Sequence, residues 1–343
     1  MSQGVCATKS VEEQLAHFVE DLEESMGYEV KSDVSCRNVL LCGMGGSGFS
    51  GMFVSDYCFS DSRIPIKTNG NPYLPKWVSK DTLLVVSSYS GNTVEVLQMF
   101  LDGIERGCRI IAMCSGGKLK RLADEYGMEC ILLPGNMQPR HAIGFMIGYT
   151  LAILNKVGAI ENLGDIRDCI DNLKKYRDTL NDFDSDNEAS ELVKMFDRCV
   201  PVICIDPSLI SIGFRWKTQI NENSKRVAFK HVTKDSIMGI MDAWGDSNRR
   251  EFALVSMSGY DDGFINHNSM VMVKDGCADD SIPFKGCYTH CDSMVEGMFK
   301  HLILGDYASL YFAKRRGVEP TAVPSITDLK IRMEKMSFRP EGL

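Results

Sequence analysis

The chain has 343 residues, 44% of them hydrophobic and 24% charged, so it can bury a substantial core, and its length suggests two domains. A formal net charge of -8 excludes a general nucleic-acid binder, which needs a basic face to neutralise phosphates. The sequence has no apolar run long enough to cross a bilayer, and its first residues lack the pattern of a secretory signal. We therefore expect a cytoplasmic globular protein without a nucleic-acid or membrane partner.

Thirteen cysteines are scattered along the chain, and their odd number without an export signal predicts reduced thiols. Cys287, His290 and Cys291 form the one compact group of metal-ligating residue types, but no second pair of ligands lies at the spacing of a zinc finger. The sequence therefore predicts neither a metal site nor a cofactor.

The first half of the sequence alternates short apolar runs with helical patterns. Residues 11–26 carry apolar side chains at helical spacing, after a capping box formed by Ser10 and Glu13. Strands are predicted at 38–42, 82–86, 109–113 and 130–133, with a helix after each of the first three. Strands that alternate with helices predict a parallel sheet covered by helices on both faces.

A second region of the same kind follows. The polar segment at 181–187, NDFDSDN, is the least structured-looking part of the chain, and we interpret it as the linker between the halves. Beyond it, strands are predicted at 200–205, 227–229, 252–257 and 269–273, and a helix at 212–226. The predicted architecture is two α/β domains, the first at 1–160 and the second at 161–343.

The stretch GMGGSG, at 43–48, follows the first predicted strand and matches the GxGxxG pattern of dinucleotide-binding loops. A dinucleotide site also needs an acidic residue at the end of the next strand, where it holds the ribose hydroxyls. The next apolar run ends instead in Asn69 and Gly70. The sequence therefore disfavours a nucleotide-dependent enzyme.

The loop after the second strand, SSYSGNT at 87–93, carries hydroxyls up to the start of a helix. Hydroxyls and backbone N–H groups at a helix N-terminus make an uncharged cradle suited to one phosphate monoester. Either loop alone is equally compatible with simple helix capping. Two such loops at the carboxyl ends of two strands favour phosphate binding, because ligands of open α/β sheets bind at that edge.

Further motifs follow these two along the chain, and the full set in order is GMGGSG, SYSGNT, SGGKL, PRHAIG, RWKTQINENSK, GVEPT and VPSITDLK. Together they resemble the archaeal and bacterial bifunctional phosphoglucose/phosphomannose isomerases of the sugar isomerase (SIS) family, over residues 38–330. The resemblance implies two three-layer αβα SIS domains, each with a mainly parallel sheet. It also implies a homodimer that converts glucose 6-phosphate or mannose 6-phosphate to fructose 6-phosphate.

The resemblance further implies a set of site residues. Those that bind the sugar phosphate are Gly46, Ser47, Ser88, Ser90, Thr93 and Thr321. Glu222 is implied as the base that moves a proton through an enediolate, Arg140 as the cation beside the developing oxyanion, and Lys330 as a third catalytic residue. Lys330 would assist ring opening or hold a hydroxyl, and Thr321 would contact the sugar near C2.

Spacing alone leaves other interpretations of two of these residues open. Glu222 lies three residues before Lys225, at the spacing of a solvated ion pair on a helix. Lys330 lies beside the apolar residues of a predicted helix, where a lysine is usually solvated. The family motif is what favours a catalytic role for both.

One segment departs from the family pattern. The family typically carries a histidine that opens the sugar ring, and counting back from Trp244 places Met238 at its position. A thioether cannot transfer a proton near neutral pH, so the usual ring-opening group is absent, and His231 and His141 are candidate substitutes. The alternative function is therefore a catalytically weak or silent SIS protein that binds a sugar phosphate as a sensor or regulator.

Overall fold

The computed structural model describes residues 10–232, 239, 242, 251–257, 273–277, 282–287 and 291–337. The chain folds into two compact units, of which the first is Met1–Leu163 with Val323–Leu343 and the second is Gly164–Ala322. The C-terminal helix α13 (Pro324–Ser337) contacts α4 (Val94–Glu105) and therefore belongs to the first unit. The predicted division at 160/161 assigned this helix to the second domain.

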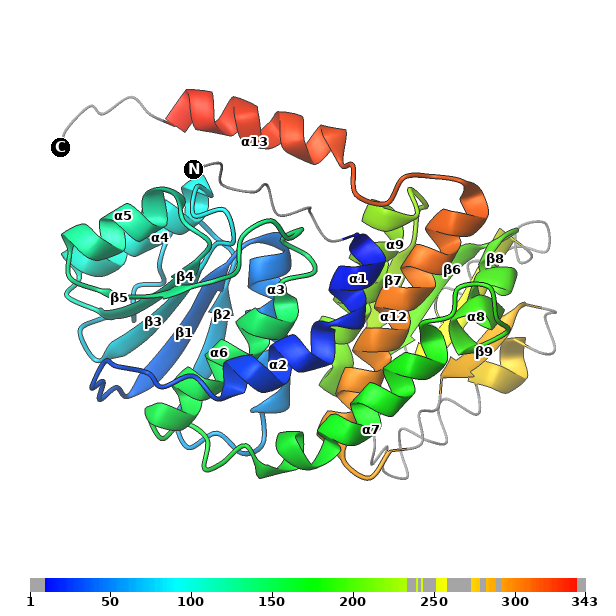
Figure 1. Ribbon diagram of the computed structural model, residues 1–343, viewed down its shortest axis with the longest axis horizontal. Helices are drawn as coiled ribbons and strands as arrows, with labels where there is room; N and C mark the ends of the chain where they lie inside the picture. The colour runs from blue at the N-terminus through cyan, green and yellow to red at the C-terminus, as the bar shows by residue number, and fades with distance from the viewer. Residues whose placement is uncertain are drawn as a thin grey trace, which may run out of the picture. The chain divides into compact units, whose positions relative to one another are not determined.

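The first unit contains a five-stranded parallel sheet with the strand order β2-β1-β3-β4-β5 (Figure 1). Its strands are β1 (Asn38–Gly43), β2 (Ile66–Asn69), β3 (Thr82–Ser87), β4 (Arg109–Cys114) and β5 (Glu129–Leu132). β1 and β3 are almost continuously apolar because helices cover both faces of the sheet. The strands predicted in the first half of the sequence are confirmed.

Alternate residues of each strand pack on opposite faces of this sheet. Leu84 and Ile110 join a core cluster with residues of α4 and of α5 (Gly117–Glu125). Leu41 faces the other side, where it contacts Gly51 of α3 (Gly45–Tyr57). The remaining helices are α1 (Val11–Ala16), α2 (Phe18–Met26) and α6 (Ile143–Lys156).

Helix α6 is largely buried, and two glycines allow α2 to approach it closely. A Cβ at Gly144 would lie 2.6 Å from the Phe18 carbonyl oxygen, and one at Gly148 would lie 2.7 Å from that of Leu22. Both distances are shorter than any ordinary van der Waals contact, so a larger residue would push α2 away. This packing fixes the first turns of α6 against α2.

The second unit contains a four-stranded parallel sheet with the order β7-β6-β8-β9. Its strands are β6 (Val200–Ile205), β7 (Phe229–Val232), β8 (Phe252–Met257) and β9 (Phe284–Cys287). Its helices are α7 (Gly164–Leu180), α8 (Glu188–Phe196), the 3₁₀ turn η1 (Pro207–Leu209), α9 (Ile210–Asn223) and α12 (Met294–Arg316). Most of the strand predicted at 269–273 lies outside the described residues, and β9 was not predicted.

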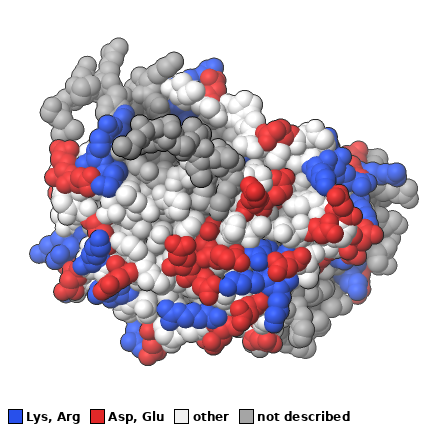
Figure 2. Space-filling model, in the orientation of Figure 1, with Lys and Arg blue, Asp and Glu red and all other residues white. Residues whose placement is uncertain are grey.

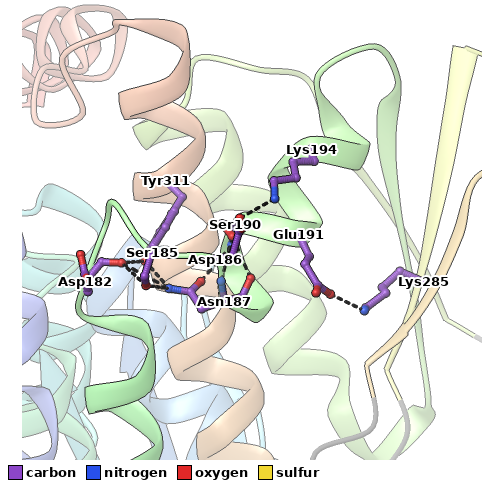
Figure 3. A network of polar contacts seen from close by, with 9 residues as sticks. All are labelled: Asp182, Ser185, Asp186, Asn187, Ser190, Glu191, Lys194, Lys285 and Tyr311. Carbon is purple, nitrogen blue, oxygen red and sulfur yellow. Dashed lines mark hydrogen bonds and ion pairs between the residues drawn. The ribbon is translucent and has the colours of Figure 1, made fainter.

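The segment at 181–187 is not a linker between domains, and that prediction was wrong. It forms the turn between α7 and α8, inside the second unit. Tyr311 of α12 holds it in place, because its Oη lies 2.5 Å from the Asp182 carbonyl oxygen (Figure 3). The same Oη lies 3.0 Å from the Leu180 carbonyl oxygen. The Phe183 ring stacks on Tyr311 with centroids 4.5 Å apart. The turn is polar in sequence but held by tertiary contacts.

Charge on the described surface is mixed. Basic and acidic side chains lie among one another on the face shown in Figure 2. Exposed ion pairs include Lys314 with Asp184 at 2.8 Å and Lys285 with Glu191 at 2.9 Å. Such pairs contribute about 0–1 kcal/mol each, so the two folds depend mainly on buried contacts.

Candidate functional site

The strand order of the first sheet reverses between β1 and β3, which are neighbours. Open α/β sheets bind ligands in the crevice outside the carboxyl ends of the strands at such a reversal. The two hydroxyl-bearing loops lie at this point, one after β1 at 43–48 and the other after β3 at 87–93. The predicted phosphate-binding residues of the first unit therefore gather at one edge of one sheet.

The first loop turns so tightly that glycine is required. A Cβ at Gly43 would lie 2.9 Å from the Ser47 carbonyl oxygen, and one at Gly48 would lie 2.6 Å from the Gly43 carbonyl oxygen. Helix α3 therefore begins at Gly45, directly after the strand. Buried Ser47 lies in its first turn, and its Oγ accepts a hydrogen bond from the Tyr89 N–H at 3.1 Å. Ser47 thus joins the first loop to the second.

The second loop presents hydroxyls beside the start of α4. Ser88 Oγ lies 2.9 Å from Thr93 Oγ1. Thr93 is the N-cap residue of α4, but its side chain makes no capping hydrogen bond. Ser90 is exposed, and its Oγ accepts from the Asn92 N–H at 3.2 Å. The Thr93 hydroxyl therefore does not serve the capping role that spacing alone left open.

A third loop, at 115–116, and the first turn of α5 contact the second loop. A Cβ at Gly91, whose φ is 65°, would collide with the Gly116 carbonyl oxygen and lie 2.9 Å from its carbonyl carbon. The Lys118 N–H donates to Asn92 Oδ1 at 3.1 Å, and the Leu119 N–H donates to the Gly91 carbonyl at 2.8 Å. Sequence reasoning missed this role, although the glycines of SGGKL and SYSGNT were the signal for a close backbone approach.

The segment at 134–142 brings Arg140 to the same edge. Arg140 is 6% exposed, and the neighbouring His141 is buried as well. A Cβ at Gly46 would lie 3.0 Å from the Pro139 carbonyl oxygen and 3.2 Å from Arg140 Cα. The backbone of this segment therefore lies directly against the first loop.

In the second unit, helix α9 carries the motif RWKTQINENSK, and much of this motif packs against α12. Arg215 forms a buried, bidentate ion pair with Asp306, with Nε–Oδ1 at 2.9 Å and Nη2–Oδ2 at 2.8 Å. Trp216 Nε1 donates to the His301 carbonyl at 2.7 Å, and Asn223 Nδ2 donates to Ser309 Oγ at 2.9 Å. These residues anchor the helix that carries Glu222.

Glu222 lies in the last turn of α9 and is half-buried. The Lys225 ammonium donates to the main-chain carbonyl of Glu222, and also to that of Pro320 at 3.3 Å. Thr321 follows in a turn where the Glu319 carboxylate accepts from its N–H at 3.0 Å. Burial raises the pKa of Glu319, but hydrogen bonds from this turn outweigh it and hold the pKa below its usual value. Glu222 and Thr321 are therefore linked through Lys225 within one unit.

The other predicted site residues are not among the residues brought together at the loops of the first sheet or at the end of α9. Lys330 is exposed on α13. His231 is half-buried on the edge strand β7, where burial and then Lys230 lower its pKa. Met238 lies outside the described residues, as does His290 of the compact cysteine group. No group of three or more potential metal ligands occurs within the described part of the chain.

Two parallel sheets covered by helices, with glycine and hydroxyl loops where the first sheet reverses, define an α/β protein of the phosphosugar isomerase fold. The tagatose-6-phosphate ketose/aldose isomerase from Escherichia coli has this fold, with a TM-score of 0.68 at 15% identity over 93% of this chain and 96% of that chain. Residues 185–333 match the bacterial phospho-glucose isomerase C-terminal SIS domain.

Proteins related in sequence identify the family within this fold. A bifunctional phosphoglucose/phosphomannose isomerase from Caldicellulosiruptor bescii is 30% identical over 324 residues, which cover 90% of this chain and 95% of that protein. Another from Thermoplasma acidophilum is 29% identical over 93% of this chain and 99% of that protein. The chain belongs to the bifunctional phosphoglucose/phosphomannose isomerase family, and the resemblance drawn from its motifs is confirmed.

Proposed function

We propose that the protein is a sugar-phosphate aldose–ketose isomerase that interconverts glucose 6-phosphate or mannose 6-phosphate with fructose 6-phosphate. Relatives named for this activity align over nearly the whole chain, which supports the reaction. The observation that carries the proposal is the neutral cradle of hydroxyls and helix N-termini at the reversal of the first sheet.

The phosphate group of the substrate binds in this cradle. Its hydroxyls belong to Ser47, Ser88, Ser90 and Thr93, and Gly46 contributes its backbone N–H at the start of α3. The N–H groups and the dipole at a helix N-terminus attract a phosphate dianion without a full positive charge. A cradle of this kind suits a substrate that must be released at every turnover.

We assign the proton transfer at the reacting carbons to Glu222 and Arg140. Isomerisation moves a proton between C2 of the aldose and C1 of the ketose through an enediolate, so it needs a carboxylate base and a cation beside the developing oxyanion. Glu222 takes the first role and Arg140 the second. Lys330 assists ring opening or holds a hydroxyl, and Thr321 contacts the sugar near C2, where glucose and mannose differ.

Ring opening is the step for which the family histidine is missing, because Met238 stands at its position. His141 and His231 are the proposed substitutes for the family histidine. The lowered pKa of His231 keeps its imidazole neutral near pH 7, in the form that accepts a proton. If neither acts, Met238→His should raise turnover of glucose 6-phosphate and mannose 6-phosphate, with a gain confined to these aldoses.

A homodimer and a cytoplasmic location complete the proposal, and both are supported by the family resemblance. No helix in the described parts of the chain is long and apolar enough to cross a membrane. Light scattering of the purified chain tests the dimer.

Coupled assays with fructose 6-phosphate, glucose 6-phosphate and mannose 6-phosphate test the reaction. Glu222→Gln removes the base but keeps its shape, so turnover should fall by a factor on the order of 10²–10⁴. The matched control is Glu125→Gln, an exposed glutamate at the end of α5, which should leave turnover unchanged.

Two other outcomes would change the conclusion. A protein that melts at a higher temperature with fructose 6-phosphate, yet turns over none of the three sugars, would favour the sensor alternative. Equal turnover by the parent and Glu222→Gln would show that Glu222 is not the base.

A further inference from the structure

Tyr89 makes hydrogen bonds to three other segments at this edge of the first sheet. Its N–H donates to Ser47 Oγ at 3.1 Å, and its carbonyl accepts from the N–H and Oγ of Ser115 at 2.8 and 2.7 Å. Its phenol donates to the Pro134 carbonyl at 2.8 Å and accepts from the Met137 N–H at 2.8 Å. One residue of the second loop therefore binds the first loop, the third loop and the segment that carries Arg140.

The Tyr89 side chain is largely buried. Tyr89 is 8% exposed, and its ring belongs to a buried cluster with Leu133, Ala142, Phe145 and Met146. Burial raises the pKa of Tyr89, although the hydrogen bond from Met137 lowers it, so the phenol remains protonated near neutral pH and donates to Pro134. Removing the hydroxyl would release the carbonyl of exposed Pro134 and the N–H of half-buried Met137, which water can reach, so the loss should fall on the position of this segment more than on the stability of the fold.

The segment that these bonds hold has little regular structure of its own. Residues 133–142 lie between β5 and α6, outside any helix or strand. Asn136 lies between the two residues bound by the phenol and has a φ of 61°, a left-handed conformation that asparagine adopts more readily than most residues and that turns the chain here. The Gln138 N–H donates to Gln14 Oε1 at 2.9 Å, which is a second support from α1. The backbone before Arg140 therefore depends on its neighbours for its shape.

We propose that Tyr89 is a positioning residue whose phenol fixes the segment before Arg140, and with it the guanidinium, against the phosphate-binding loops. This inference rests on the proposed isomerase function. The phenol bonds to Pro134 and Met137, whereas the Ser88 and Thr93 hydroxyls bond to each other, so loss of the phenol should move Arg140 and leave the phosphate cradle in place.

Tyr89→Phe is the direct test, because phenylalanine keeps the ring and removes only the hydroxyl. Displacement of a catalytic group by about 1 Å costs up to about 10²-fold in rate. We expect kcat for fructose 6-phosphate to fall about 10-fold or more, while KM stays within about twofold. Tyr149→Phe, in a tyrosine that packs against the same cluster, should leave both constants unchanged.

A double-mutant comparison with Arg140 separates a positioning role of Tyr89 from a general loss of stability. If Tyr89 acts through Arg140, then Tyr89→Phe should cost little further activity in an Arg140→Lys background. A purely structural role would lower the melting temperature and give the same fold-loss in both backgrounds. Equal kcat for the parent and Tyr89→Phe, or full additivity with Arg140→Lys, would overturn the proposal.

A binding measurement keeps this test independent of turnover. A five-carbon phosphosugar acid places a carboxylate where the enediolate develops, whereas inorganic phosphate occupies only the cradle. Tyr89→Phe should weaken binding of the acid about 10-fold and leave inorganic phosphate within about twofold. A parent protein without activity that shows this selective loss would refute the isomerase but keep the positioning role. Equal weakening of both ligands, or of neither, would refute the positioning role.

Discussion

The two units have sheets of related order but use their motif residues differently. In the first, β1 lies between β2 and β3, and in the second, β6 lies between β7 and β8. The motifs of the first unit lie in loops, where hydroxyls and glycines gather at the edge proposed to bind the ligand. The main motif of the second unit lies on α9, and several of its residues pack against α12. Motifs shared with a family can therefore form a loop cluster, the proposed binding site, in one unit and mainly a packed helix in the other.

The two regions also differ in the forces that hold them. The loops of the first unit meet through neutral hydrogen bonds and through glycines that leave no room for a side chain. Helix α9 of the second unit is fixed by a fully buried ion pair between Arg215 and Asp306. Substitutions should therefore act locally in the first case and on the whole unit in the second.

The largest expected effect follows from breaking that ion pair. Asp306→Ala leaves the Arg215 guanidinium buried without its carboxylate, so the free energy of unfolding should fall by about 3–5 kcal/mol in urea denaturation. Asp197→Ala, which removes the partner of half-exposed Arg315, is the control and should cost less than about 1 kcal/mol. Similar losses in both variants would contradict the claim that α9 depends on the buried pair.

A smaller but more local effect is expected in the first unit. Gly91→Ala adds a Cβ against the Gly116 carbonyl at a positive φ, so it should cost about 2–3 kcal/mol and abolish the thermal stabilisation by fructose 6-phosphate. Gly107→Ala is a matched control, because its φ is 67° and no other atom lies near the added Cβ. It should cost only about 1–2 kcal/mol and retain stabilisation by the ligand. Loss of ligand stabilisation in both would show that strain alone explains the result.

Much of the first fold was predictable because its signals are local. Apolar runs indicated the strands at 38–42 and 82–86, and their polar ends indicated the edge where Ser47 and Ser88 lie. The contact of Gly91 with Gly116 was not predictable from spacing, because it joins loops that follow different strands. The sequence showed which residues cluster at the edge but not how the loops support one another.

The wrong prediction of a linker at 181–187 also arose because contacts between distant segments are not visible in the sequence. The polar residues at 181–187 resemble a solvated connection, and no local pattern reveals that Tyr311, far along the chain, fastens them (Figure 3). The motif on α9 shows the converse limit. Spacing could not separate Arg215, which is buried against Asp306, from Glu222, which is half-buried on the same helix. Both distinctions depend on which element packs against which.

The smallest expected effect concerns Glu129, and it tests whether a charged side chain also stabilises the first unit. The Glu129 carboxylate on edge strand β5 accepts from the N–H groups of Lys31 at 3.1 Å and Ser32 at 2.7 Å, and from Tyr28 Oη at 3.1 Å. Burial raises the pKa of Glu129, but the hydrogen bonds from Ser32, Lys31 and Tyr28 outweigh it and hold the pKa below its usual value.

Because the folded pKa lies below the unfolded value of about 4.3, this carboxylate stabilises the protein above that pH and loses its effect as the pH falls through the folded pKa. Glu129→Gln should therefore cost about 1 kcal/mol at pH 7, and the difference from the parent should shrink below about pH 4. Urea denaturation across this range measures both. A difference that does not change with pH would mean that the amide loses packing rather than charge, and the first unit would then depend on neutral contacts here as well.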